Sequence, residues 1–264
     1  GLFTEQDRSI ATIKSKSRPF LLRRMKKDVL EDLPDLVNRD VLLTMSPDQE
    51  SLYQELSLLA RNKLVELNEE SGEKVAEVRM KVLALLTRLR QVCLSSELIL
   101  NKSQVSPKLD YLGEQVQFLL EQGESVLVFS QFTSFMDLIG KQFKSLGLDY
   151  FRLDGTTSLD KRRKAIDTFQ KSDEPQVFML SLKAGGFGLN LTKASYVFIC
   201  DPWWNPAVEE QAFSRAHRIG QKKSVIVTRL VMAKSIEEKI VELQQHKQKL
   251  LNDILTDDLA TASF

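Results

Sequence analysis

The sequence predicts an α/β fold built on a buried parallel sheet. From residue 125 onward, short runs of apolar, β-type residues alternate with stretches of helical spacing. Strands that are apolar along their whole length are typical of parallel sheets that helices cover on both faces. The chain has 264 residues, of which 42% are hydrophobic, and is long enough to bury such a core.

The first hundred residues are expected to form helices and basic loops outside this sheet. Residues 17–34, SRPFLLRRMKKDVLEDLP, are cationic and carry apolar side chains at helical spacing. The helix predicted over residues 46–67 begins with a capping box between Ser46 and Gln49, and its leucines are expected to share one face. A second long helix, apolar along one side, is predicted over residues 75–94.

Five strands are predicted, and helices fall between several of them, for example over residues 160–170. The strands span residues 125–130, 149–154, 176–181, 196–200 and 225–231. A last helix, over residues 235–255, is expected to begin with a capping box between Ser235 and Glu238. Ligands bind at the carboxyl ends of the strands in sheets of this class, so the residues directly after each strand form the candidate site.

Composition limits the classes of partner and compartment. Lys and Arg number 37 against 36 Asp and Glu, so any nucleic-acid surface must be a local patch. The two cysteines, Cys93 and Cys200, indicate a reducing, intracellular setting. No signal peptide and no membrane-spanning run is visible. Because the chain begins without methionine, we expect it to be a segment of a longer protein.

A glycine-rich loop, LSLKAGGFGLNLT at residues 180–192, directly follows a predicted strand. Glycines such as Gly185 and Gly188 let the backbone approach a ligand, and the backbone N–H groups of such a loop can hold an anion. Ser181 and Lys183 add a hydroxyl donor and a cation. The alternative is a simple turn between strand and helix, and the G-x-G-x-x-G spacing of a dinucleotide site is absent.

Both tryptophans of the chain are adjacent, in DPWWNPA at residues 201–207. Neighbouring side chains in an extended loop point in opposite directions, so we expect one indole to pack inward and the other to remain available to a ligand. The alternative is that Trp203 and Trp204 both belong to the core.

The segment QAFSRAHRIGQ, residues 211–221, is expected to be a helix that Gly220 ends. On a helix, Gln211, Arg215 and Arg218 share one face, and two adjacent guanidinium groups suit an anion such as phosphate. The alternative is that the arginines form salt bridges, with Glu209 or Glu210 for example. His217 is expected to be structural rather than a catalytic base.

The sequence lacks the apparatus that would hold a nucleotide by itself. There is no G-x-x-x-x-G-K-[ST] loop, and two histidines and two cysteines assemble no convincing hydrolase or zinc site, so no metal ligand is predicted. The chain thus has arginines that suit a phosphate but no loop that would bind one by itself. This combination fits an arginine finger that acts across a domain interface.

Four stretches, VLVFSQF, FRLDGTT, LSLKAGGFGLNLTKASYVFICDPWWNP and QAFSRAHRIGQ, together resemble the second RecA-like lobe of the Swi/Snf family of DNA-translocating ATPases, in helicase superfamily two. The resemblance extends over essentially the whole chain. It implies an inter-lobe linker and helical protrusion over residues 1–105, the RecA-like lobe over 106–234, and a bracing helix and tail over 235–264. The run CLSSEL departs from the family, where a Cys-Asn-His-Pro-like run is frequent.

The resemblance also implies roles for individual residues. Arg215 and Arg218 would reach the γ-phosphate of an ATP that a first lobe outside this chain holds together with Mg²⁺. Gln211 belongs to the same motif, and Gly188 and Asn190 would approach the nucleotide. The residues that would contact the DNA are Ser130, Gln131, Arg152, Ser181, Lys183, Gly185 and Trp204.

The implied function is that of a motor lobe in an ATP-dependent translocase on double-stranded DNA, intracellular and DNA-associated, with no membrane partner. Its partners would be the duplex, the N-terminal lobe of the same protein and a DNA-bound protein that is remodelled. Because the phosphate loop is missing, we expect the chain alone to hydrolyse no ATP. Two alternatives stay open, a binding module that does not serve hydrolysis and a lobe of a strand-separating helicase.

Overall fold

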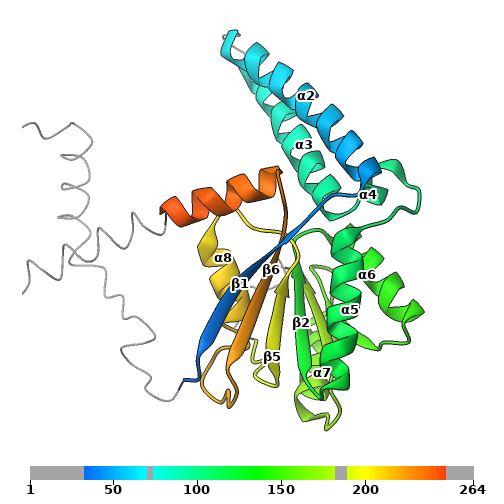
Figure 1. The fold of residues 1–264 in the computed structure, drawn as a ribbon. Helices are drawn as coiled ribbons and strands as arrows, with labels where there is room; N and C mark the ends of the chain where they lie inside the picture. The colour runs from blue at the N-terminus through cyan, green and yellow to red at the C-terminus, as the bar shows by residue number, and fades with distance from the viewer. Residues whose placement is uncertain (1–32, 70–73, 182–188, 248–264) are drawn as a thin grey trace, which may run out of the picture. The chain divides into compact units, whose positions relative to one another are not determined.

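The computed structural model describes residues 33–69, 74–181 and 189–247 of the chain (Figure 1). The chain divides into two compact units between Leu33 and Pro34, and the fold below is that of the second unit. Among the described residues, no helix combines the length and apolar character that crossing a bilayer requires.

Six strands form one sheet in the order β1-β6-β5-β2-β4-β3, and every neighbouring pair is parallel. The strands are β1 (Leu36–Leu43), β2 (Ser125–Ser130), β3 (Tyr150–Leu153), β4 (Val177–Ser181), β5 (Ala194–Ile199) and β6 (Val225–Met232). All five predicted strands are present, each within two residues of its expected bounds. The predicted parallel α/β sheet is therefore confirmed.

The edge strand β1 is the element that the sequence did not predict. It pairs with β6 in a register that begins with Leu36 opposite Val225. Most of its side chains are exposed, and Arg39 and Asp40 interrupt its apolar residues, so it lacks the continuous apolar run of a buried strand. The strand comes from residues 1–105, the segment expected to be linker and protrusion, and the proposed boundary after residue 105 stays a prediction.

Helices cover both faces of the sheet, as Figure 1 shows. They are α5 (Pro107–Glu121), α6 (Thr133–Ser145), α7 (Leu159–Lys171) and α8 (Pro206–Phe213). Alternate residues of β2 point to opposite faces. Val126 and Val128 join the core beneath α5 and α6, whereas Leu127 and Phe129 join the core with Phe169 of α7 and α8. The central strands β2 and β4 are therefore buried on both faces.

Outside these layers, three helices precede the first central strand. They are α2 (Pro47–Glu69), α3 (Lys74–Leu94) and the short α4 (Glu97–Leu100). α2 and α3 pack against each other as a hairpin around Leu56 and Leu89. The predicted capping box is present, with reciprocal contacts of 3.4 Å between Ser46 and Gln49.

The predicted apolar face of α2 is wrong in part. Leu59 and Leu64 were expected on the buried stripe but are exposed, because the hairpin buries only the residues that face α3.

Residues 236–247 are helical, and the rest of the helix predicted to residue 255 lies outside the described residues. Its cap differs from the prediction, because Glu238 accepts from the N–H of Lys234 while the Ser235 hydroxyl accepts from the N–H of Glu237. Leu243, whose helical spacing from Ile236 and Ile240 in the sequence predicts an apolar stripe, is exposed.

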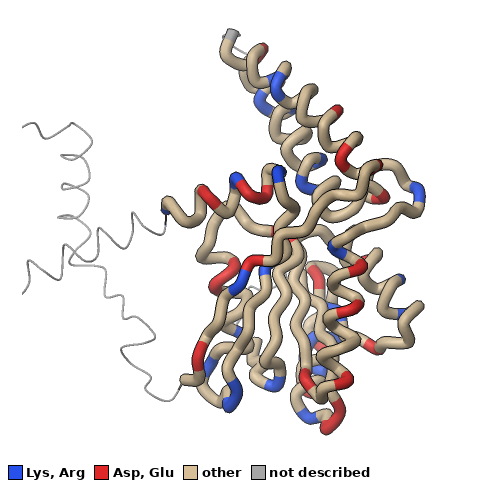
Figure 2. Tube along the Cα trace, viewed as in Figure 1, with Lys and Arg blue, Asp and Glu red and all other residues tan. Residues whose placement is uncertain are grey.

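Figure 2 shows acidic and basic residues interspersed along the helices and loops, whereas β2, β4 and β5 carry neither. This distribution agrees with the balanced composition of the chain.

Candidate functional site

The parallel register gathers the predicted site residues at one edge of the sheet. Ser130, at the end of β2, lies opposite Ser181, at the end of β4. Leu153 pairs with Leu180, which places Asp154 beside Ser181. All these strand ends lie at the carboxyl edge, where α/β sheets bind ligands.

Asp201, directly after β5, is the centre of a polar cluster at this edge. It is fully buried and accepts from the Ser130 hydroxyl at 2.6 Å and from the backbone N–H of Gln131 at 3.2 Å. The Gln131 side-chain amide also donates to it. Burial raises the pKa of Asp201, and the hydrogen bonds from Ser130 and Gln131 oppose that rise.

Ser130 and Gln131 thus hold the end of β5 in place. Ser130 is fully buried and its hydroxyl is occupied by Asp201, so its side chain does not reach the surface. Gln131 is half-buried. Their DNA contacts remain predictions. In the structure, Ser130 stabilises the loop after β5 through its hydrogen bond to Asp201.

The tryptophan pair follows the predicted alternation. Trp203 packs against the core between the sheet and α8, whereas Trp204 is 38% exposed. The Trp203 N–H donates to Glu209 at 2.7 Å, and the Gln244 amide donates to the Trp203 carbonyl. The loop that carries the exposed indole is therefore held from α8 and from the C-terminal helix.

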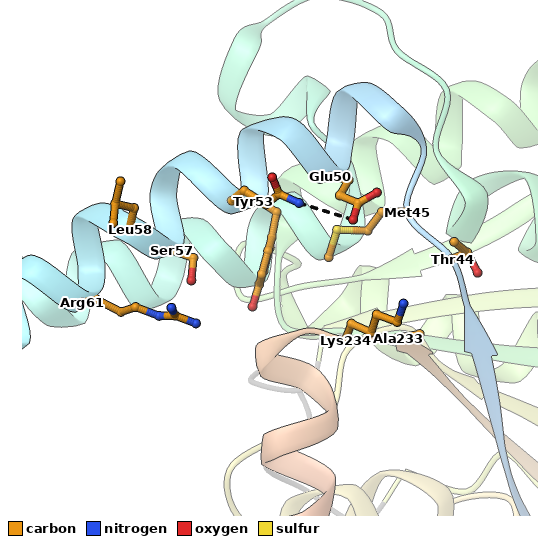
Figure 3. A pocket seen from close by; sticks show the side chains of 10 residues that line it. Thr44, Met45, Glu50, Tyr53, Ser57, Leu58, Arg61, Ala233 and Lys234 are labelled. Atoms are coloured by element: carbon orange, nitrogen blue, oxygen red, sulfur yellow. Dashed lines mark hydrogen bonds between the residues drawn. The ribbon is translucent and has the colours of Figure 1, made fainter.

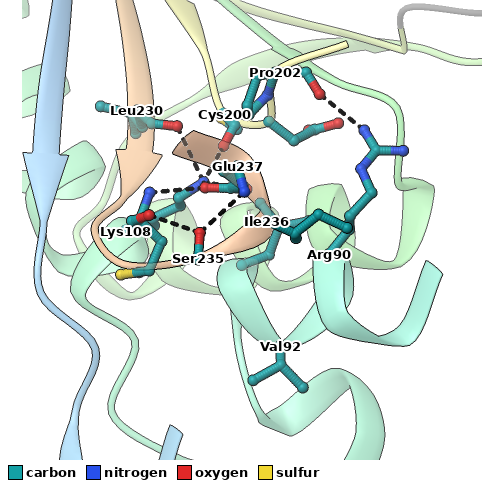
Figure 4. A network of polar contacts seen from close by, with 12 residues as sticks. Arg90, Val92, Lys108, Cys200, Pro202, Leu230, Ser235, Ile236 and Glu237 are labelled. Atoms are coloured by element: carbon teal, nitrogen blue, oxygen red, sulfur yellow. Dashed lines mark hydrogen bonds and ion pairs between the residues drawn. The ribbon is translucent and has the colours of Figure 1, made fainter. Parts of the chain in front are cut away.

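Arg90 of α3 is a residue at this edge that sequence analysis missed. Its guanidinium carbon lies 5.5 Å from the ring centroid of Phe132 and 5.7 Å from those of Trp203 and Trp204. The guanidinium donates to the Gln131 side-chain oxygen at 3.0 Å. It also donates to the Pro202 carbonyl at 2.8 Å, as Figure 4 shows. An arginine directly after Leu89, on the apolar side of a predicted helix, was the available signal.

Arg152, in β3, and Asp154, directly after that strand, form a hydrogen-bonded network on the side of β4 that faces away from β2. Arg152 donates to Asp154 at 3.0 Å and forms an ion pair with Asp137. Asp154 accepts from the hydroxyl and the N–H of Thr156, at 2.6 and 3.0 Å. The hydroxyl contact lowers the pKa of Asp154. Arg152, which the resemblance assigns to DNA, thus has two carboxylates as internal partners.

The segment of the two arginines corrects the predicted helix. α8 ends at Phe213, and Arg215 and Arg218 lie in the turns that follow. A continuing helix would use the carbonyls of Arg215 and Ala216 for its own bonds. Here the Arg215 carbonyl accepts from the N–H of Leu191 at 3.0 Å, and that of Ala216 accepts from the Gln221 amide at 3.2 Å. Tertiary contacts therefore override the helical pattern.

Arg215 is held inside the molecule, while Arg218 is exposed. Arg215 is 6% exposed, and its guanidinium carbon lies 5.9 Å from the ring centroid of Phe129. Burial, together with the positive charge of Arg162, lowers the pKa of Arg215 to about 10. The guanidinium is still charged at neutral pH, and a nearby anion would stabilise it.

Glu209, which was considered as a partner for the arginines, has other contacts. Its carboxylate lies 3.1 Å from Arg229 and accepts from the Gln244 amide at 2.8 Å. Burial raises the pKa of Glu209, and Arg229 opposes that rise. His217 lies 2.7 Å from the Pro34 carbonyl, which agrees with the structural role predicted for it.

The glycine-rich loop is described only at its ends. Lys183, Gly185 and Gly188 lie outside the described residues. Ser181 is buried, and Asn190 is exposed next to Leu191, the residue that binds the Arg215 carbonyl. Gln211 is exposed on α8.

A pocket of about 490 Å³ lies elsewhere, between α2 and the turn after β6 (Figure 3). Tyr53, Arg61 and Lys234 are among its lining residues, and the Tyr53 hydroxyl accepts from the N–H of Ile236 at 2.7 Å. No residue predicted for the site lines it. Among the described residues, no group of three or more His, Cys, Asp or Glu side chains could hold a metal ion.

The chain is similar to known proteins in sequence and in fold. The sequence matches the family profile described as Helicase conserved C-terminal domain over residues 107–220, and that of the SNF2-related domain over residues 3–98. A Mycoplasma pneumoniae protein named "Uncharacterized ATP-dependent helicase" is 34% identical over 97% of this chain and 25% of its own length. The mouse SWI/SNF-related matrix-associated actin-dependent regulator of chromatin subfamily A member 1 is 36% identical over 88% of this chain and 23% of its own length. The chain thus spans about a quarter of the length of these relatives.

Two solved structures from Sulfolobus solfataricus are similar in fold. The SWI2/SNF2 ATPase C-terminal domain has 29% identity and a TM-score of 0.66, covering 83% of this chain and 90% of that one. The SWI2/SNF2 ATPase core in complex with dsDNA has 30% identity and a TM-score of 0.69, covering 94% of this chain and 52% of that one. The chain therefore belongs to the Swi/Snf family of helicase superfamily two and carries the C-terminal RecA-like lobe of that family.

Proposed function

We propose that this chain is the second motor lobe of an ATP-dependent translocase that moves along double-stranded DNA. The observation that carries the proposal is the placement of Arg215, a buried guanidinium at the carboxyl edge of a parallel sheet. Burial and the charge of Arg162 make the cation less stable there, and a phosphate would restore that stability.

In this proposal the chain completes an ATP site that a first RecA-like lobe provides together with Mg²⁺. Arg215 is already fixed by its backbone bond to Leu191 and by its contact with Phe129, so it would lose little freedom on meeting a phosphate. Arg218 is exposed in the next turn and can reach across an interface. Gln211 and Asn190 are also exposed. Both belong to sequence motifs that would approach the nucleotide.

The proposed DNA contact involves the loops that follow β2 and β5 at the carboxyl edge of the sheet. Trp204 is exposed and Gln131 is half-buried beside it, linked through Arg90. A family member solved with double-stranded DNA has the same fold, which supports the duplex as the partner. Because the phosphate backbone dominates binding to duplex DNA, we expect binding that depends on salt and only weakly on sequence. A protein bound to the same DNA would be the object that the motor displaces or remodels.

The proposal is tested in a protein that joins a first lobe to this chain. Arginine fingers contribute about 10³-fold to 10⁵-fold to turnover, so Arg218→Ala should lower DNA-stimulated ATP hydrolysis by about 10³-fold while duplex binding is retained. Lys222→Ala, which removes an exposed cation four residues away, is the control and should hydrolyse ATP normally. Near-normal turnover by Arg218→Ala would refute the finger role, as would appreciable hydrolysis by this chain alone.

Assays on the same two-lobe protein distinguish a translocase from the two alternative functions. A translocase should displace a third strand from a triplex and leave the duplex intact, whereas a strand-separating helicase should unwind the duplex. ATP turnover that neither duplex DNA nor Arg218→Ala changes would favour a binding module that does not serve hydrolysis.

A further inference from the structure

Arg90 connects the α2–α3 hairpin to the edge where DNA is proposed to bind. Only 6% of the residue is exposed, so its charge is largely unavailable for a phosphate contact. Instead it donates to Gln131 at 3.0 Å and to the Pro202 carbonyl at 2.8 Å. These two partners belong to the loops after β2 and β5, so Arg90 bridges two neighbouring strand ends.

The guanidinium also contacts the aromatic rings of both loops. It lies 5.5 Å from the centroid of Phe132 and 5.7 Å from that of Trp204, within the range of a favourable cation–π contact. Trp204 is 38% exposed, so Arg90 supports its indole from the inside while another part faces solvent. An arginine suits this position because its planar group can stack and donate two hydrogen bonds at once.

The end of α3 that carries Arg90 is firmly anchored. The Gln49 amide of α2 donates to the carbonyl of Val92, and the Ser106 hydroxyl donates to that of Leu94 at 2.7 Å. Movement of the hairpin relative to the sheet would therefore move Arg90, and with it the side chains that Arg90 holds.

We propose that Arg90 is a positioning residue, which orients Gln131 and Trp204 for the DNA backbone and couples the α2–α3 hairpin to that contact. The inference rests on the proposed function, because it assumes that this edge binds duplex DNA. It predicts that Arg90 affects DNA affinity through Trp204 rather than by its own charge.

The test uses the chain itself, in which Trp203 and Trp204 are the only fluorophores of their kind. Arg90→Met should change the tryptophan emission spectrum without DNA, whereas Arg88→Met, at an exposed arginine of the same helix, should not. Arg90→Met should also weaken binding to a labelled 20-base-pair duplex by about tenfold. Arg90→Lys keeps the charge but loses the planar group that donates two hydrogen bonds, so its duplex affinity should lie between those of Arg90→Met and the unmodified chain. It replaces Arg90→Met if that variant does not fold.

A double-mutant cycle then tests the route of the effect. If Arg90 acts through Trp204, Arg90→Met should weaken duplex binding far less in a Trp204→Ala background than in the unmodified chain. Equal losses in both backgrounds, or unchanged affinity of Arg90→Met and Arg90→Lys, would overturn the inference while the proposed function stands. Failure of the unmodified chain to bind duplex DNA would overturn both.

Discussion

Lys108 and Glu237 form a fully buried ion pair, with the Lys108 ammonium 2.7 and 2.8 Å from the two carboxylate oxygens. The ammonium also donates to the carbonyls of Cys200 at 2.6 Å and Leu230 at 3.1 Å, and the Glu237 carboxylate accepts from the N–H of Met232 at 2.8 Å (Figure 4). One pair thus joins the start of α5, the ends of β5 and β6, and the C-terminal helix. Cys200 is the residue directly before Asp201, so the pair supports the edge of the sheet at which the candidate site lies.

Loss of one partner from this pair should destabilise the lobe strongly. Lys108→Met leaves a buried carboxylate without its cation, which costs about 3–5 kcal/mol in comparable cases. The double variant Lys108→Met/Glu237→Leu removes both charges and should recover a large part of that loss. Urea unfolding of the chain measures both values, with Lys141→Met as the control because Lys141 is exposed and its pair with Glu97 is long, at 3.9 Å. A double variant no more stable than Lys108→Met would contradict the expectation.

The destabilisation of Lys108→Met should also depend on pH. Burial raises the pKa of Glu237 above its ordinary value of 4.5, and the Lys108 charge opposes that rise. Without Lys108 the folded-state pKa rises further. A raised pKa gives stability that is present below the unfolded value and is lost as pH increases through the folded value. The difference in unfolding free energy between Lys108→Met and the unmodified chain should therefore be small near pH 4 and grow toward pH 7.

Unfolding measurements at several pH values check this sign. Lys108→Met/Glu237→Leu lacks the carboxylate, so its difference from Lys108→Met should shrink as pH falls. A deficit of Lys108→Met that is constant from pH 4 to pH 7 would be the contrary result.

Gln221 should control the turns that present the two arginines. Its amide donates to the carbonyls of Thr192, Ala194 and Ala216, at 3.0, 2.9 and 3.2 Å. Gln221→Glu keeps the shape but places an acceptor oxygen against three carbonyls. The lost hydrogen bonds and the unmatched buried group should cost about 2–4 kcal/mol of unfolding free energy.

The same variant should affect catalysis in a protein that contains both lobes. Because the Ala216 carbonyl lies between Arg215 and Arg218, Gln221→Glu should lower ATP turnover more than duplex affinity. Gln245→Glu, at an exposed glutamine of the C-terminal helix, serves as the control for the added charge. Normal stability of Gln221→Glu would show that the three contacts contribute little.

The central strands could be predicted from the sequence because each is a local signal. β2 and β4 are buried along their whole length, so their apolar runs mark them without knowledge of their neighbours. β1 could not be found in this way. Its Arg39 donates to Thr228 and its Asp40 binds Arg229, each 189 residues away. When the hydrogen-bond partners of polar residues lie on a strand so far away in the sequence, the local sequence pattern is typical of a loop.

The geometry of the candidate site could be predicted only in part. The i, i+4 spacing of Gln211 and Arg215 predicted a helix, yet the Arg215 carbonyl binds Leu191 and the helix has already ended. The strand ends were correctly expected to meet, since parallel strands bring their carboxyl ends to one edge. Arg90 and Pro202 are 112 residues apart in the sequence. Their contact could not be predicted locally, because the only indication in the sequence is a cation on an apolar helix face.

Trp204 should contribute to DNA affinity through its ring rather than through charge. Its indole is exposed at the proposed DNA edge, where packing against the sugar–phosphate backbone would bury its ring without adding a charge. Trp204→Ala should therefore weaken duplex binding by about tenfold at fixed salt, a change of about 1.4 kcal/mol. Because it removes no cation, the slope of log affinity against log salt should stay unchanged.

Gln131 and Lys193 provide the comparisons for this experiment. Gln131→Ala removes a neutral side chain beside Trp204 and should also leave the salt slope unchanged, with a smaller loss of affinity. Lys193 donates to the carbonyls of Ser172 and Glu174, near the start of β4 and so at the opposite edge of the sheet. Lys193→Ala should then change neither affinity nor slope. If Trp204→Ala bound the duplex as tightly as the unmodified chain, the indole would lie outside the DNA contact, and the grip would have to come from charged residues alone.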